Sequence, residues 1–308
     1  MNTELLKKLT IAIPVYNDEK YIRQTVESCI GQAAKIIIYD NASTDGTPDI
    51  CAELARRYDN VEHMRHAQNV GAFENFRISL FDCETEYFCW LGSHDILAPL
   101  YSLHILTEME KNPAAALGTG KIVYIDEEGA KTGQVTQSRW TERMRGKDAL
   151  DRSGICAVKI KDCFLFYNIQ RTARAQAAWF NQPSLGFDRA YLCKLAAEGE
   201  FIYAPEAVFF ARDFDKTRKT MTTNDRRAKV IGKSEDAPIS KDLLNRNKSM
   251  VLTVLDQAAN DEDLGRALGY IDQMNRRYSS RRKFQRKRIL HAVLAAAGIA
   301  LVTFLALR

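Results

Sequence analysis

The sequence predicts a Rossmann-like α/β fold in which a mostly parallel sheet carries helices on both faces. Two observations lead to this prediction: short apolar runs alternate with amphipathic segments, and clusters of polar residues follow the apolar runs. The chain has 308 residues, of which 46% are hydrophobic, so it can bury one large core or two smaller ones.

The alternation is clearest in the first third of the chain. Residues 9–15 are an apolar run typical of a buried strand, and a helix is expected to begin at Asn17. Residues 35–40 repeat the strand pattern, and Thr47 with Pro48 is typical of the start of the next helix. The same patterns predict strands at 61–64 and 87–91, a helix over 72–81 and another helix from about residue 99.

After about residue 120 the pattern is less regular. Residues 126–148 are rich in Arg, Lys, Thr and Gln, which favours a surface loop or a helical flap. The remaining predicted elements are helices over 171–179 and 188–198, a strand within 201–212, a polar and mobile stretch over 213–247, and a helical hairpin over 240–280.

Polar clusters follow three of the predicted strands. Tyr16 and Asn17 follow the first strand, residues 40–46 end the second, and residues 92–95 follow the strand at 87–91. In an open parallel sheet, ligands bind outside the carboxyl ends of the strands. We therefore expect the three clusters to converge on one cleft.

Four segments around these clusters share a pattern with a known family. They read TIAIPVYNDEKYI from residue 10, IIIYDNASTDGT from residue 36, QNVGAFENF from residue 68 and WLGSHDIL from residue 90. Together they resemble family two glycosyltransferases of the GT-A fold, and the resemblance extends over about residues 9–212. It implies transfer of a sugar from a nucleoside diphosphate sugar with inversion at the anomeric carbon.

The resemblance assigns nucleotide-sugar binding to residues at the strand ends. Asp40 would accept a hydrogen bond from the base, because an ionised carboxylate only accepts and the imide N–H of a base donates. The other residues implied to bind the nucleotide sugar are Pro14, Tyr16, Asn17, Asn69, Gly71, Ser93 and Arg212. Asp45 fits either a nucleotide contact or support of the turn before Thr47.

The cluster at 92–95 departs from the family pattern, which is D-x-D-D and contacts the ribose and a divalent metal. Here the sequence is Gly92, Ser93, His94 and Asp95, so two carboxylates are replaced. His94 and Asp95 are the predicted ligands of Mn²⁺ or Mg²⁺, and a nitrogen ligand suits Mn²⁺ better. Two alternatives stay open: Asp95 holds the metal with diphosphate oxygens and water, or no metal binds.

Inversion requires a general base that takes the proton of the acceptor hydroxyl. Asp188 matches the Asp of a family E-D pair at a helix start, with Phe187 in place of Glu, and is the predicted catalytic base. The alternative is a carboxylate that only complements the helix dipole. Arg212 matches a family arginine near the diphosphate, with a solvated surface arginine as the alternative. Trp179 and Tyr167 are candidates for contact with the acceptor.

The C-terminal part of the chain has a different composition. Residues 276–308 contain nine Lys or Arg and no acid, whereas the whole chain has a formal net charge of +5. Residues 289–307 contain no acid or base apart from His291, and at ~1.5 Å per residue a helix of this length just crosses a bilayer core. A C-terminal membrane helix on the cytoplasmic face of the inner membrane is predicted. A buried or in-plane helix is the alternative.

The cysteines and the chain start predict a cytoplasmic location for the enzyme domain. Seven scattered cysteines without a CxxC pair suit reduced thiols, and we expect no metal site from them. The first residues lack the apolar region and cleavage site of a secretory signal. Because the excess positive charge lies in the tail, nucleic acid is not a predicted partner.

These observations give a domain prediction and competing functional hypotheses. Residues 1–212 form the GT-A domain, with a nucleotide-sugar half over about 9–120 and an acceptor half over about 121–212; a polar helical extension (213–275) and the basic tail (276–308) follow. The favoured function is an inverting glycosyltransferase that acts on a glycan or lipid-linked acceptor of the cell envelope. The alternative is a catalytically impaired scaffold protein of the same fold at the membrane. A nucleotidyltransferase fits less well, because the stretch after the first strand is acidic and lacks glycine.

Overall fold

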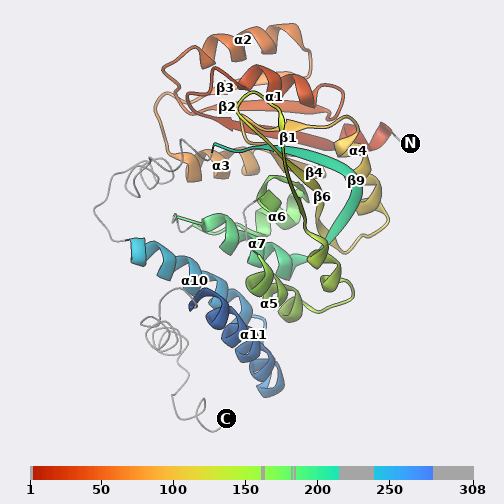
Figure 1. Cartoon of the computed structure of the whole chain (residues 1–308), viewed down its shortest axis with the longest axis vertical. Helices are drawn as coiled ribbons and strands as arrows, with labels where there is room; N and C mark the ends of the chain where they lie inside the picture. The colour runs from red at the N-terminus through yellow and green to blue at the C-terminus, as the bar shows by residue number, and fades with distance from the viewer. Residues whose placement is uncertain (1–2, 161–163, 182, 184, 215–238, 280–308) are drawn as a thin grey trace.

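The computed structural model describes residues 3–160, 164–181, 183, 185–214 and 239–279. In this part of the chain nine strands form one sheet in the order β3-β2-β1-β4-β8-β6-β9-β5, and β7 pairs with β6. Helices cover both faces of the sheet, with α1 and α2 on one side and α3 and α7 on the other (Figure 1). The predicted α/β class is confirmed.

The first seven elements after a short N-terminal 3-10 helix (Thr3–Lys8) follow the predicted alternation. They are β1 (Leu9–Val15), α1 (Ile22–Cys29), β2 (Lys35–Asp40), α2 (Thr47–Arg57), β3 (Val61–Arg65), α3 (Ala72–Phe81) and β4 (Tyr87–Trp90). β1 pairs in parallel with β2 and β4, and β2 pairs in parallel with β3. α1 begins later than predicted, because Asn17 has a positive φ of 51° that a right-handed helix does not allow.

The second half of the sheet is mixed rather than parallel. Its elements are β5 (Ile96–Leu97), α4 (Tyr101–Glu110), β6 (Ala115–Ile125), β7 (Lys131–Gln137), α5 (Ala149–Lys159), β8 (Ile169–Arg171), α6 (Thr172–Ala178), α7 (Phe187–Glu198) and β9 (Glu200–Arg212). β6 and β9 are parallel, whereas β8 pairs antiparallel with β4 and β6, and β5 pairs antiparallel with β9.

The prediction of a loop or helical flap over 126–148 was wrong for residues 131–137, which form a strand. β7 forms a hairpin with β6, and a 3-10 helix follows at Arg139–Met144. Nearly all of β7 is exposed, so it has no buried face to produce an alternating apolar pattern in the sequence.

Each face of the sheet packs against its own hydrophobic cluster. Along β1, Ala12 belongs to the cluster with α3, α5 and α7, whereas Ile11 and Ile13 belong to the cluster with α1, α2 and α4. The same split separates Phe88 and Cys89 in β4. This period of two arises because the side chains of successive strand residues point to opposite faces of the sheet.

Two helices follow the gap in the described chain and extend the first of these clusters. α10 (Ile239–Leu255) and α11 (Asp261–Ser279) place Met250, Val254 and Ile271 against α5 and α7, which confirms the predicted helical hairpin. Most of the predicted mobile stretch at 213–247 and the predicted membrane helix at 289–307 lie outside the described residues. Among the residues that are described, no helix is both long and apolar enough to span a membrane.

Candidate functional site

The strand register brings the carboxyl ends of β1, β2 and β3, where several predicted site residues lie, to one end of the sheet, the carboxyl edge. Val15 pairs with Asp40, and Asp40 pairs with Arg65, so the ends of β1, β2 and β3 are level. Pro14 lies in β1 opposite Tyr39. Figure 1 shows the start of α3 and the end of β9 on this side of the molecule.

The loops after β1 and β2 are joined by hydrogen bonds. Tyr16 is exposed, whereas the main-chain N–H of Asn17 donates to Oγ of Ser43 (3.0 Å). In return, Thr44 donates its main-chain N–H to the side-chain oxygen of Asn17 (2.8 Å). Asn17 therefore holds the two loops together, and the exposed ring of Tyr16 is left at the surface of the edge.

Asp45 has the contacts of a turn-supporting residue. Its Oδ1 accepts the N–H of Thr47 (3.0 Å), the first residue of α2, and its Oδ2 accepts the N–H of Glu19 (3.2 Å). Burial acts to raise the pKa of Asp45, but hydrogen bonds from Thr47 and Glu19 outweigh burial, so its pKa lies below the ordinary value. These contacts favour the supporting role over a nucleotide contact.

Asp40 is completely buried at the end of β2. Its Oδ1 accepts the N–H of Ser43 (2.9 Å), and its Oδ2 accepts Nε of Arg65 (3.0 Å) and lies 3.7 Å from Nε2 of His63. Burial acts to raise its pKa, yet the interactions with His63 and Ser43 outweigh burial and the pKa of Asp40 is lowered. The Arg65 side chain, which pairs with the buried Asp40, is itself half exposed at the carboxyl edge.

Asn69 and Gly71 form the predicted tight turn. The side-chain oxygen of Asn69 accepts the N–H of Gly71 (2.8 Å) and the side-chain amide of Asn41 (3.0 Å). Asn41 also accepts the N–H of Val70 (2.8 Å). Gly71 has a φ of 83° and a ψ of 157°, a conformation that favours glycine. The turn is consequently tied to the loop after β2.

The carboxylate of Asp18, in the loop after β1, contacts the cluster after β4. Oδ2 of Asp18 accepts the hydroxyl of Ser93 (2.5 Å) and lies 3.1 Å from Nδ1 of His94. The main-chain N–H of Asp18 donates to Oγ1 of Thr47 (2.9 Å). Asp18 was not predicted as a site residue, because the sequence places it only in a helix start, and its side-chain partners Ser93 and His94 lie more than 70 positions away.

Asp95 and Arg212 meet because β5 and β9 are paired. Ile96 lies opposite Phe210, and this register brings Oδ1 of Asp95 within 2.8 Å of the main-chain N of Arg212, which donates to it. Both residues are buried. A Cβ on Gly92 would lie 2.6 Å from Oδ2 of Asp95 and 3.8 Å from Nε2 of His94, so these two atoms face the same space.

Asp188 lies in α7, which covers the same face of the sheet as α3. It lies in the first turn of α7, and its Oδ1 accepts the N–H of Arg189 (2.9 Å). The adjacent Phe187 packs 5.0 Å, centroid to centroid, from Phe73 at the start of α3, the helix that follows Gly71. The start of α7 is therefore fixed beside the turn that carries Gly71.

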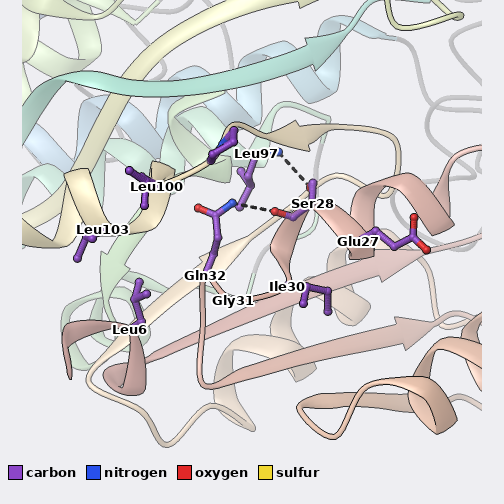
Figure 2. Close-up of a pocket in the computed structure, with 10 residues that line it drawn as sticks. Leu6, Glu27, Ser28, Ile30, Gly31, Gln32, Leu97, Leu100 and Leu103 are labelled. Carbon is purple, nitrogen blue, oxygen red and sulfur yellow. Dashed lines mark hydrogen bonds between the residues drawn. The ribbon is translucent and has the colours of Figure 1, made fainter. Parts of the chain in front are cut away.

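A separate cavity of about 380 Å³ lies at the other end of α1 (Figure 2). Four of its ten lining residues are leucines, including Leu6 and Leu103, and none of the predicted site residues contributes to it. The polar groups there bond within the protein: Ser28 accepts the N–H of Leu97 (3.2 Å), and Gln32 donates to the main-chain oxygen of Ser28 (2.7 Å). It is distinct from the carboxyl edge.

Comparisons with known proteins address the family directly. The family model described as "Glycosyl transferase family 2" matches residues 10–167. An uncharacterized glycosyltransferase of Haemophilus influenzae is 25% identical over 189 residues, which cover 59% of this chain and 56% of that protein. Abequosyltransferase RfbV of Salmonella typhimurium is 33% identical over 97 residues, 29% of each chain. The chain thus spans about half or less of the relatives that it matches.

A solved structure has a similar fold. Residues 1–349 of Staphylococcus aureus TarS in complex with UDP superpose with a TM-score of 0.63 at 14% sequence identity, over 90% of this chain and 74% of that one. Such low identity shows the fold alone, and it confirms the predicted GT-A type of architecture. Because the family model covers half of the sequence, this chain belongs to glycosyl transferase family 2.

Proposed function

We propose that this chain is an inverting glycosyltransferase that moves a sugar from a nucleoside diphosphate sugar to a glycan or lipid-linked acceptor of the cell envelope. The observation that carries the proposal is the hydrogen-bonded carboxyl edge, where Asp18, Ser43 and Asp95 tie together the loops after β1, β2 and β4 and the end of β9. Loops held in one arrangement suit a polar donor that must be oriented for reaction.

The names of related proteins support this class of substrate. TarS has been crystallised with UDP and with UDP-GlcNAc. The Salmonella relative is an abequosyltransferase, and a teichoic acid poly(glycerol phosphate) polymerase of Staphylococcus epidermidis is 34% identical over 97 residues, 30% of this chain and 14% of that protein. A nucleotide-sugar donor and an envelope polymer or lipid-linked acceptor are consistent with these names.

The proposed site for the nucleobase of the donor combines Asp40 and Arg65. Asp40 is too buried to lie at the surface itself, but its carboxylate fixes Nε of Arg65, whose side chain is half exposed. Arg65 also donates to the main-chain oxygen of Ser43 (2.9 Å). Pro14, Tyr16, Asn69 and Gly71 would complete the nucleoside site.

Asp188 is the proposed general base. In the transfer step the acceptor hydroxyl oxygen forms a bond to the anomeric carbon, and the bond from that carbon to the diphosphate oxygen breaks. The nucleoside diphosphate leaves with the electron pair, and the hydroxyl proton moves to the carboxylate of Asp188. Attack from the side opposite the leaving group inverts the anomeric configuration.

We include a divalent metal, Mn²⁺ or Mg²⁺, in the proposal. Oδ2 of Asp95 and Nε2 of His94 face the space that a side chain on Gly92 would fill, which suits two ligands of one cation. In the part of the chain that the structure describes, no group of three His, Cys, Asp or Glu side chains could hold a metal. Diphosphate oxygens and water would supply the other ligands, and the bound ion would neutralise diphosphate charge.

Attachment to the cytoplasmic face of the inner membrane is also proposed, from the sequence of the tail. The basic residues from Arg276 and the apolar run at 289–307 support it. Membrane attachment would bring the site close to a lipid-linked acceptor.

Calorimetric titration of the detergent-solubilised protein with UDP and GDP, in Mn²⁺, Mg²⁺ or EDTA, tests the donor site. We expect one nucleotide to bind, and Asp40→Ala to abolish that binding. Metal dependence would support the role of His94 and Asp95. Nucleotide binding without sugar transfer to envelope acceptors would favour the scaffold hypothesis, and no binding of either nucleotide would contradict UDP- and GDP-sugar transfer.

A further inference from the structure

The side chain of Arg212, the last residue of β9, donates hydrogen bonds to other groups of the protein. Its Nε donates to the main-chain oxygen of His94 (2.9 Å), and its Nη1 donates to the main-chain oxygens of Asp126 and Glu127 (both 2.8 Å). Its Nη2 donates to Oε1 of Gln24 (2.9 Å). These bonds use four of the five N–H groups of the guanidinium, and the residue is only 3% exposed.

The flat face and the main chain of Arg212 are engaged as well. The ring of Tyr21 lies 4.5 Å from the guanidinium carbon, which is a cation–π distance. The main-chain N–H donates to Asp95, as described above. One residue therefore connects the start of α1, the loop at 92–95 and the turn between β6 and β7.

These contacts leave Arg212 poorly suited to bind a phosphate directly. Bidentate recognition of a phosphate uses two parallel N–H groups of one guanidinium, and four of the five are already directed at protein oxygens. We propose that Arg212 is a positioning residue, which holds the loop at 92–95 and the β6–β7 turn against α1, and that it is not a ligand of the donor diphosphate.

The proposal rests on the proposed function, because the loop at 92–95 carries the residues assigned to the donor. Arginine and lysine at position 212 should also differ in effect. A lysine at 212 keeps the positive charge, but its single ammonium group cannot reach four acceptors on three segments at once. Arg212→Lys should therefore fail to rescue a positioning role, whereas it would rescue much of a simple charge interaction with phosphate.

Arg171 offers a matched control. It too is an arginine at the end of a strand, with Nε and Nη2 donating to the main-chain oxygens of Ala115 and Met109 (both 3.1 Å). Its guanidinium lies 5.0 Å from the ring of Tyr87. Arg171→Lys disturbs the same kind of network at the start of β4, where no predicted site residue lies.

The test compares Arg212→Lys, Arg212→Gln and Arg171→Lys with the wild-type chain. Hydrogen–deuterium exchange is measured at residues 92–95 and 126–129 without nucleotide, and UDP affinity is measured by calorimetry. We expect both Arg212 variants to exchange faster at both segments and to bind UDP ~10–100-fold more weakly, the range for residues that orient metal ligands. Arg171→Lys should keep wild-type exchange there and wild-type UDP affinity.

Two results would overturn the proposal. One is wild-type exchange at both segments in both Arg212 variants; the other is wild-type UDP affinity in Arg212→Lys with loss of affinity in Arg212→Gln. If the Arg212 variants do not fold, Gln24→Ala removes one acceptor of the network, and unchanged exchange in it would equally contradict the proposal. If the wild-type chain binds no nucleotide, the proposed function fails, but the exchange comparison still decides whether Arg212 positions the loop.

Discussion

Where family carboxylates are replaced after β4, each polar side chain has a hydrogen-bonding partner. Ser93 and His94 bond to Asp18, and Asp95 bonds to the main chain of Arg212. Buried side-chain polar atoms without a hydrogen bond do occur in the described chain, in His63, Ser102 and Trp179, but not at this strand end. Because native proteins satisfy nearly all their buried polar groups, this strand end is an integral, hydrogen-bonded part of the fold.

Gly92→Ala tests how tightly this arrangement is packed. The added Cβ would lie 2.6 Å from Oδ2 of Asp95, whose other oxygen is held by Arg212, so Asp95 must move. We expect a loss of ~1–3 kcal/mol in the free energy of unfolding, typical of overpacking, together with weaker nucleotide binding. Urea unfolding and calorimetry measure both effects.

Gly265→Ala in α11 is the control for this substitution. A Cβ there meets no atom within 4 Å, so alanine should be neutral or stabilise the helix by up to ~1 kcal/mol. Equal stability of Gly92→Ala and the wild-type chain would contradict the packing argument.

Asp40→Asn should lower stability at neutral pH. The amide has one acceptor oxygen in place of two, so either Nε of Arg65 or the N–H of Ser43 loses its partner, and leaving a buried polar group unpaired costs ~1–3 kcal/mol. The pKa of Asp40 is lowered by folding, so its stabilising contribution is present above the unfolded pKa and is lost as pH falls through the folded pKa. The difference between wild type and variant should shrink below about pH 4. Urea unfolding at pH 7 and below pH 4 measures it, and a pH-independent difference would contradict the assignment.

The helices and strands that the sequence predicted are those with a regular apolar pattern. Strands β1, β2 and β4 are apolar runs buried on both faces, and the helices between them have regular apolar positions, so their order and the edge that they form were predictable. β8 has three residues and β7 is almost wholly exposed, so neither produces a recognisable pattern. Contacts such as Asp18 with His94 depend on tertiary packing and leave no local signal.

The packing of α10 on α7 gives a prediction about these elements. Met250 in α10 is fully buried in the cluster that contains Tyr191 and Leu195 of α7. Met250→Ala should cost ~2–5 kcal/mol in unfolding free energy, and amide exchange in α7 should rise with it. If exchange rose only within α10, then α10 and α7 would not unfold as one unit. Lys248→Ala, at an exposed position of the same helix, is the control.

Charged and apolar residues are distributed unevenly along the chain. The described part folds around two cores on either side of one sheet, and its acidic residues offset its basic ones. The excess of positive charge belongs to residues 276–308, directly before and after the apolar run at 289–307. The sequence thus separates a transferase body from a segment whose composition suits an anionic lipid surface.

Vesicle binding distinguishes the possible roles of that segment. The full chain should sediment with vesicles of anionic lipid, whereas a chain that ends at Ser279 should stay in the supernatant, because it lacks the apolar run and six of the eight basic residues before it. Binding that high salt reverses would indicate a surface-bound, in-plane helix, since ionic screening weakens only the electrostatic part. Binding that resists both salt and alkaline carbonate would indicate a spanning helix. Equal sedimentation of the two chains would contradict attachment through the tail and place any membrane contact on the body.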